Sequence, residues 1–156
     1  MLQKITRKKI EAPGTRFAII ASTYNARYVD AMLRAARAEI LRAGGKLQIV
    51  RVPGAFEIPV VAALLAREAN VIQEPFAILC LGVILRGATT HAQHIAEAVS
   101  HALVQIQVQY EVPVIHEVLL LENEQQARER CLSRTHNRGT EAAQTALQMT
   151  RVLQGL

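Results

Sequence analysis

Uninterrupted apolar segments alternate with segments of helical periodicity along this chain. Residues 16–22 and 76–85 are apolar almost throughout, which is typical of strands that are covered on both faces. Residues 46–52 alternate between apolar and polar positions, and this pattern predicts a strand with one exposed face. A fourth strand is predicted over residues 113–121.

Helical spacing fills the intervals between these strands. It predicts helices over residues 27–43, 57–69 and 90–110. Asn123, followed three residues later by Gln126, predicts the capping box of a short helix. The last helix is expected to begin at Asn137 and to bury one apolar side, formed by Ala142, Ala143, Ala146, Leu147 and Leu153.

Strands that alternate with helices imply right-handed crossovers between parallel strands. We therefore predict an α/β fold, a three-layer α/β/α sandwich with a four-stranded parallel sheet. Ligands of such sheets bind beyond the carboxyl ends of the strands. Three loops reach that edge, formed by residues 23–25, 53–57 and 86–91, and we expect a binding site where they converge.

The loop of residues 86–91 carries the strongest chemical signal. A buried strand ends before it, and Thr89, Thr90 and His91 stand where the next helix begins. The unpaired N–H groups of a helix start attract phosphate, and the same field keeps His91 neutral and able to accept a proton near pH 7. Taken alone, His91 favours a structural histidine, but its two threonine neighbours favour an enzyme site for a phosphorylated small molecule.

Three other side chains have both a structural and a functional interpretation. Tyr24 follows the first strand and either packs on its turn or stacks on a flat heterocycle. Glu57 either caps the helix that follows it or accepts hydrogen bonds from ligand hydroxyls. Arg130 either forms a solvated salt bridge with Glu129 or Glu124 or binds phosphate.

Length and charge exclude several classes of protein. The 156 residues fit one domain, predicted over residues 15–156 after a basic arm of residues 1–14. Four of the five net positive charges lie in the first ten residues, so the remainder is nearly neutral and the arm is interpreted as a solvated tail. An RNA-binding module is the alternative, but three Phe, three Tyr and no Trp offer few stacking surfaces. We expect neither a nucleic-acid partner nor a membrane partner.

Cysteine and histidine usage points to a site without a metal or cofactor. Cys80 and Cys131 form no CxxC pair, and the first residues lack the apolar core of a secretory signal, so the cytoplasm is the expected compartment. His91 and His94 lie three residues apart, but no further ligand at suitable spacing completes a zinc site. No GxGxxG follows the first strand, which argues against a dinucleotide dehydrogenase.

Three motifs resemble one family. VPGAFEIP at residues 52–59, GVILRGATTH at 82–91 and NRG at 137–139 are similar to those of 6,7-dimethyl-8-ribityllumazine synthases, enzymes of riboflavin biosynthesis. The resemblance runs from about Arg16 to the C-terminus. It implies a flavodoxin-like sandwich and a condensation of 5-amino-6-(D-ribitylamino)uracil with 3,4-dihydroxy-2-butanone 4-phosphate, with no cofactor.

The resemblance also implies roles for matching positions. Tyr24 corresponds to the aromatic residue that stacks on the pyrimidine ring, and His91 to the proton-transfer residue. Arg130 corresponds to a phosphate-binding arginine from a neighbouring subunit. The remaining substrate-binding positions in the same subunit are Ala55, Phe56, Glu57, Val83, Ile84, Leu85, Ala88 and Thr89.

Two departures from the family pattern lie in the fourth strand. The usual Phe-Gly pair is His116-Glu117, and the usual Thr-Thr pair is Leu120-Leu121. The resemblance places His116 over the pyrimidine ring of an adjacent subunit. These departures also motivate the alternative of an inactive relative that serves as a shell or scaffold protein.

Assembly is a further implication of the resemblance. The family forms homopentamers, some of which build sixty-subunit icosahedral shells, and the short connection from Cys131 to Asn137 favours a shell. Riboflavin synthase is a candidate protein partner.

Overall fold

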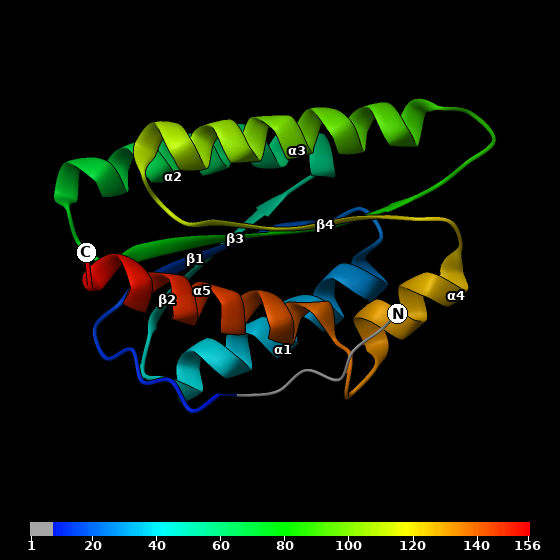
Figure 1. Ribbon diagram of the computed structural model, residues 1–156. Helices are drawn as coiled ribbons and strands as arrows, with labels where there is room; N and C mark the ends of the chain where they lie inside the picture. Colours follow the sequence, from blue (N-terminus) through cyan, green and yellow to red (C-terminus); the bar gives the residue numbers. More distant parts are fainter. Residues whose placement is uncertain (1–7) are drawn as a thin grey trace.

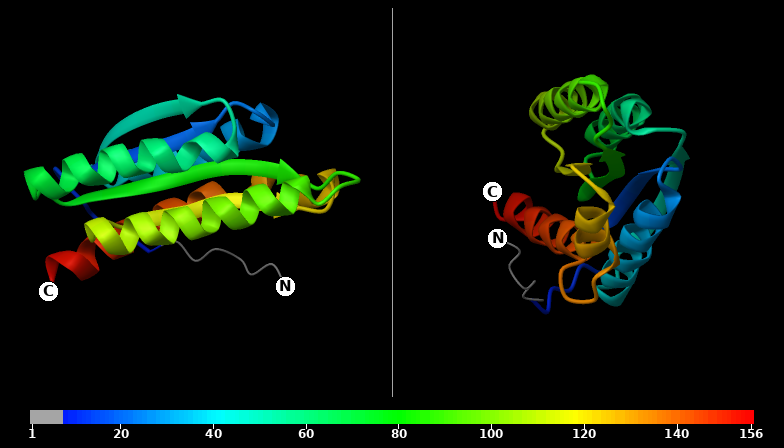
Figure 2. Two further views of the ribbon diagram at one scale, coloured as in Figure 1. Left: turned by 90° about the horizontal axis from the view of Figure 1, so that it is seen from above. Right: turned by 90° about the vertical axis from the view of Figure 1, so that its right-hand side faces the viewer.

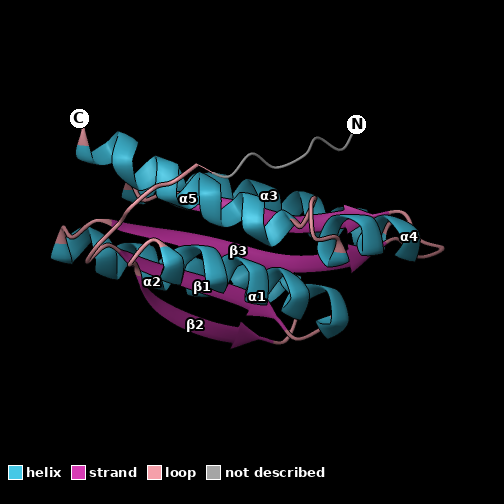
Figure 3. Ribbon diagram, turned by 90° about the horizontal axis from the view of Figure 1, so that it is seen from below, coloured by secondary structure: helices cyan, strands magenta, loops and turns pink. Residues whose placement is uncertain are grey.

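Four parallel strands form the central sheet, in the order β2-β1-β3-β4. The computed structural model describes residues 8–156 of the chain. All the strands point toward the same edge of the sheet, as the arrowheads of Figure 3 show for three of them. The predicted four-stranded parallel sheet is therefore confirmed. Its strands are β1 (Arg16–Ser22), β2 (Lys46–Val52), β3 (Phe76–Leu85) and β4 (Val114–Leu121).

Helices cover both faces of this sheet (Figure 1 and Figure 2). On one face lie α1 (Ala26–Arg42) and α5 (Arg138–Gln154), and on the other lie α2 (Ile58–Ile72) and α3 (His91–Tyr110). A 3-10 turn, η1 (Ala55–Glu57), leads into α2, where Pro59 stands in the first turn and needs no N–H partner. After β4 come α4 (Glu124–Ala127) and a π-helical turn, η2 (Arg128–Leu132).

The sheet separates two apolar cores because successive side chains of a strand point to opposite faces. Ile19 and Leu79 pack with Met32 in the core beneath α1 and α5. Ile20 and Ile78 belong to the core beneath α2 and α3. β1 and β3 are buried on both faces, as their continuous apolar sequences predict.

Two positions are more exposed than the apolar pattern predicts. In β2, Ile49 is 42% exposed and only Val52 is buried. The reason is that β2 is an edge strand, so Ile49, which is paired in register with Ile19 and shares its face, lies at the margin of the layer formed by α1 and α5. Leu153, predicted on the buried side of the last helix, is 40% exposed because it lies in the final turn of α5, where little of the chain covers it.

The residues before β1 lie against the face formed by α1 and α5. Ile10 and Ala12 are buried in that core, and the backbone N–H of Ala12 donates to the carbonyl of Ala43 at 2.7 Å. Lys4 and Arg7 of the predicted basic arm lie outside the described residues, and the domain boundary at residue 15 stays a prediction. Within residues 8–156, no helix is both long enough and apolar enough to cross a bilayer.

Side-chain caps begin the last helices where the sequence predicts them. Asn123 Oδ1 accepts from the N–H of Gln126 at 3.0 Å, while Gln126 Oε1 accepts from Glu122 rather than from Asn123. Asn137 Oδ1 accepts from the N–H of Gly139 at 2.9 Å, and its amide donates to the carbonyl of Cys131. The start of α5 is thereby tied to the end of η2.

A buried ion pair joins α5 to the sheet. Arg138 Nε donates to Glu117 Oε1 of β4 at 2.6 Å, and its Nη1 donates to Glu141 at 2.7 Å. Glu117 is only 3% exposed. One residue further, α5 approaches α1 so closely that a Cβ on Gly139 would lie 2.0 Å from the carbonyl oxygen of Met32.

Gly139→Ala is expected to destabilise the protein by about 3 kcal/mol or more, because the added methyl group collides with a backbone carbonyl that cannot rotate away. Urea unfolding measures the loss. Gly155→Ala is the matched control, since a Cβ there meets only atoms at 3.5 Å or beyond. Equal stability of the two variants would contradict the close approach of α1 and α5.

Glu117→Gln is expected to change how stability depends on pH. Burial raises the pKa of Glu117 to about 7, against the opposing attraction of Arg138. The folded state therefore holds this proton more tightly than the unfolded chain, whose carboxyl has the usual pKa near 4.5. The stability that this tighter proton binding contributes is fully present below about pH 4.5 and is lost as the pH rises toward about 7.

Urea unfolding of both proteins across this range should show the wild type losing stability relative to Glu117→Gln as the pH increases. The glutamine cannot ionise, but its amide oxygen can still accept from Arg138. Identical pH slopes for the two proteins would refute this account of Glu117.

Candidate active site

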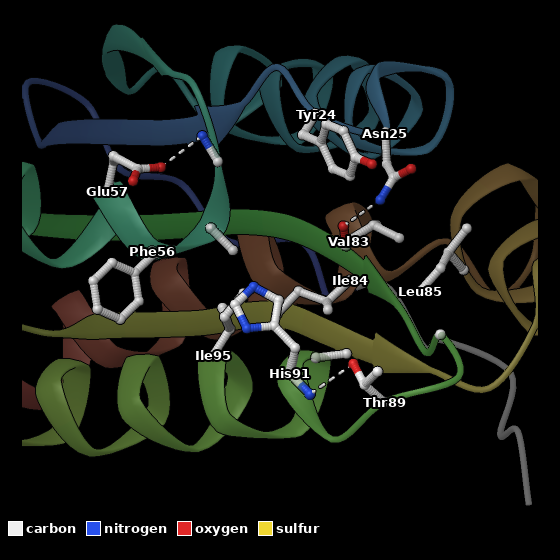
Figure 4. Close-up of a pocket in the computed structure, with 14 residues that line it drawn as sticks. Tyr24, Asn25, Phe56, Glu57, Val83, Ile84, Leu85, Thr89, His91 and Ile95 are labelled. Atoms are coloured by element: carbon white, nitrogen blue, oxygen red, sulfur yellow. Dashed lines mark hydrogen bonds between the residues drawn. The ribbon is translucent and has the colours of Figure 1, made fainter.

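The three predicted loops meet at the carboxyl edge of the sheet and enclose a cavity of about 720 Å³ (Figure 4). Tyr24 and Asn25 come from the end of β1, and the turn η1 forms a second wall. The end of β3 and the start of α3 complete it. The lining residues are Tyr24, Asn25, Gly54, Ala55, Phe56, Glu57, Val83, Ile84, Leu85, Gly87, Thr89, His91, Ala92 and Ile95.

Hydrogen bonds from the loop after β1 hold the other two walls in place. The N–H of Tyr24 donates to the carbonyl of Pro53 at 3.0 Å. Asn25 has a left-handed backbone, with φ of 55°, and its side-chain amide crosses to the carbonyl of Val83 at 2.7 Å. The Tyr24 side chain is left 74% exposed at the cavity. Its ring is thus available to a ligand rather than packed on the turn.

The second loop closes on itself through Glu57. Its Oε2 accepts from the N–H of Gly54 at 2.9 Å, so the structural interpretation of Glu57 as a capping group holds for this oxygen. A Cβ on Gly54 would lie 2.9 Å from the same oxygen, so a larger residue there would displace the Glu57 carboxylate. Glu57 Oε1 makes no hydrogen bond to any residue that the structure describes. Beside it, the Phe56 side chain is 61% exposed and lines the cavity.

The third wall is the junction between β3 and α3. Val83 and Ile84 are buried, and the N–H of Arg86 donates to the carbonyl of Leu121 at 2.8 Å, which extends the pairing of β3 with β4. The Arg86 guanidinium pairs with Glu122, 3.1 Å away. This arginine is therefore engaged outside the cavity.

The start of α3 leaves its backbone donors available. Thr90 occupies the N-cap position without a side-chain hydrogen bond, and the first turn holds no acidic residue. The Oγ1 of Thr89 lies 3.4 Å from the N–H of His91, a long contact. Free N–H groups and the helix dipole make this end attractive to an anion. Figure 4 shows the His91 imidazole extending from this turn toward the end of β3.

Three predicted site residues do not line this cavity. Ala88 lies in the loop between two lining residues, Gly87 and Thr89. His116 lies in the middle of β4, paired in register with Cys80 of β3.

Arg130 lies in η2, which follows α4. The predicted salt bridges with Glu124 and Glu129 are absent from the described part of the chain. Glu124 pairs with Arg128, and Glu129 accepts from Gln125.

The structure adds lining residues that sequence reasoning missed: Asn25, Gly54, Gly87, Ala92 and Ile95. Asn25 carried a usable signal, because asparagine tolerates the left-handed conformation that ends a strand sharply. The hydrogen bond from Asn25 to Val83 left no signal in the sequence, since the two residues lie 58 positions apart. Among residues 8–156, no group of three His, Cys, Asp or Glu side chains could hold a metal ion.

Comparison with known proteins agrees with this arrangement. The sequence profile of 6,7-dimethyl-8-ribityllumazine synthase matches residues 14–154. The enzyme of that name from Stenotrophomonas maltophilia (strain R551-3) is 39% identical over 146 residues, which cover 92% of each chain. The one from Aquifex aeolicus (strain VF5) is 36% identical over 156 residues, covering 98% of this chain and 99% of its own. Similarity that reaches from β1 to the last turn of α5 shows that the chain belongs to the 6,7-dimethyl-8-ribityllumazine synthase family.

Proposed function

We propose that this protein condenses 5-amino-6-(D-ribitylamino)uracil with 3,4-dihydroxy-2-butanone 4-phosphate to give 6,7-dimethyl-8-ribityllumazine, phosphate and water. Membership of the family supports this reaction, a transferase step of riboflavin biosynthesis. The observation that carries the proposal is the cavity itself, because exposed aromatic rings, an uncapped helix start and His91 all line it. No metal or organic cofactor takes part in the proposed reaction.

The flat uracil ring is proposed to bind between the loops that follow β1 and β2. The Tyr24 and Phe56 rings are both largely exposed there and offer stacking surfaces. The apolar end of β3 covers the inner edge of the ring through Val83, Ile84 and Leu85. The ribityl hydroxyls then donate to groups of residues 55–57, where a carboxylate oxygen of Glu57 is available.

The phosphorylated ketone is proposed to bind at the start of α3. Its phosphate would accept hydrogen bonds from backbone N–H groups near Ala88 and Thr89, which no side chain caps. This places the ketone carbonyl near the uracil amine and near His91. Holding two reactants in this geometry contributes up to about 7–11 kcal/mol toward lowering the barrier.

The chemistry then needs several proton transfers. The uracil amine attacks the ketone, and loss of water gives a Schiff base. Removal of a proton from the adjacent hydroxyl-bearing carbon expels phosphate from the next carbon and leaves an enol. The enol becomes a ketone, and the ribityl-bearing amine attacks this ketone with loss of a second water to close the ring. His91 extends into the cavity from the first turn of α3 and is the proposed proton relay for these steps.

Two proposed substrate contacts come from a neighbouring subunit. His116 and Arg130 lie outside the cavity of their own chain, so they serve such a site only across a subunit interface. We propose a homopentamer with shared active sites. A sixty-subunit icosahedral shell and an association with riboflavin synthase are further parts of this proposal. Cys80 and Cys131 are buried free thiols, which fits the proposed cytoplasmic location.

Mixing the purified protein with both substrates tests the reaction directly. We expect the absorbance and fluorescence of 6,7-dimethyl-8-ribityllumazine to rise, together with release of inorganic phosphate. Absence of product above the uncatalysed rate would refute the proposed function.

His91→Ala is expected to lower kcat by roughly 10²–10⁴-fold, the usual contribution of one positioned proton-transfer group. Binding of the two substrates next to each other survives in this variant, so turnover persists. Steady-state kinetics with both substrates measures the effect. A loss beyond about a million-fold would contradict this division between proton transfer and proximity.

Arg130→Ala is expected to raise KM for the phosphorylated ketone by at least about tenfold, because a guanidinium that binds phosphate is removed. KM for the uracil substrate should change far less. Arg128→Ala is the matched control, since Arg128 is the first residue of the same π-helical turn and its guanidinium pairs with Glu124. Equal effects on both substrates would count against a phosphate role for Arg130.

A further inference from the structure

A hydrogen-bonded pair, Ser100 and His116, lies outside the cavity on the face of β4 that α3 covers. Ser100 Oγ lies 2.8 Å from His116 Nε2. The other residues on this face of β4 are apolar and pack into the core beneath α2 and α3, as Val114 and Val118 do. His116 is the polar exception on this face, and it is exposed.

The contacts of this pair define one protonation state of the imidazole. Ser100 Oγ donates to the carbonyl of Ala96 at 2.7 Å, so its single proton is already used. The serine oxygen must then accept, and His116 Nε2 must carry the proton. On the other side of the ring, the N–H of Val118 faces Nδ1 at 3.4 Å, a long contact that favours an unprotonated Nδ1.

Partial burial of the ring supports the uncharged state. It lowers the pKa of His116 from its usual value, while a hydrogen bond with its own backbone acts in the opposite direction. Nε2 is thus engaged by Ser100 of the same subunit, and Nδ1 faces a backbone N–H. The faces of the ring are therefore the surface that it offers to another molecule.

The position of the ring gives those faces access to a neighbour. β4 pairs only with β3 among the strands that the structure describes, so its outer edge has no strand partner. α3 packs against β4, and its Ser100 contacts His116. A ring in a fixed orientation suits stacking on a flat heterocycle, because stacking uses the face of the imidazole and not its nitrogens.

We propose that Ser100 is a positioning residue that fixes the neutral Nε2–H form of His116, so that the imidazole acts as a stacking surface for the uracil ring of the neighbouring subunit and not as an acid or base. This inference rests on the proposed function for its substrate, but the state of the ring does not depend on it. It also means that replacing the family's usual phenylalanine by His116 affects how tightly the uracil substrate binds.

Nitrogen NMR of the assembled protein tests the ring itself. In the full chain labelled with ¹⁵N-histidine, His116→Phe identifies the His116 signals by difference. We expect the neutral Nε2–H form in the wild type and in Ser100→Thr, which keeps the hydroxyl. Ser100→Ala should give a mixture of tautomers or a protonated ring. Unchanged His116 signals in Ser100→Ala would overturn the positioning role, whether or not the protein is active.

Steady-state kinetics tests the stacking. His116→Ala and Ser100→Ala are expected to raise KM for the uracil substrate on the order of tenfold, with kcat and KM for the ketone changing less than about threefold. Ser100→Thr retains the hydroxyl and should stay within about threefold of the wild type. His116→Phe retains a flat ring, so its KM for the uracil substrate should rise less than that of His116→Ala.

Two kinetic outcomes would overturn the stacking role. One is impairment of His116→Phe as severe as that of His116→Ala, which would mean that a ring nitrogen is needed. The other is a loss of kcat rather than a rise in KM. If the wild type makes no lumazine at all, the proposed function and the substrate assignment both fail, while the histidine spectra still report whether Ser100 fixes the ring.

Discussion

The parallel hydrogen-bond ladder between β1 and β2 determines where the active-site walls lie. It does not stop at the last strand pair, Ser22 with Val52. The N–H of Thr23 donates to Val52 and the N–H of Tyr24 donates to Pro53, so the ladder continues into both loops. A similar extension at Arg86 prolongs β3. Because the same backbone bonds build the sheet and the rim of the cavity, exposed side chains such as Tyr24 start from rigid positions.

Much of this arrangement could be predicted from the sequence because burial and chain geometry act locally. Two continuous apolar segments and one alternating segment predicted three strands at their observed bounds, and parallel pairing then required the following loops to share one edge. β4 begins one residue later than predicted because Pro113 has no N–H to pair. The exposure of Ile49 was not predictable, since it depends on how far the layer of α1 and α5 extends over the edge strand. The roles of the site residues stay predictions, and those of Ala88, His116 and Arg130, which lie outside the cavity, rest on resemblance alone.

The two adjacent residues that depart from the family pattern serve opposite faces of β4. Side chains alternate along a strand, so His116 points toward α3 and Glu117 toward α5. Glu117 is buried and pairs with Arg138, which fastens the start of α5 to the sheet. His116 stays exposed beside Ser100. These two adjacent residues therefore contact different helices on opposite faces of the sheet, one through a buried ion pair and the other through an exposed hydrogen bond.

The contact between Gly139 and the backbone of Met32 bears on how the protein accommodates ligands. Two helices whose main chains are in contact are fixed relative to each other, because neither can slide along the other without steric overlap. The layer of α1 and α5 therefore behaves as a rigid unit on one face of the sheet. Entry of substrate and release of product are therefore expected to use rotation of rim side chains and small loop movements, and not sliding of α1 along α5.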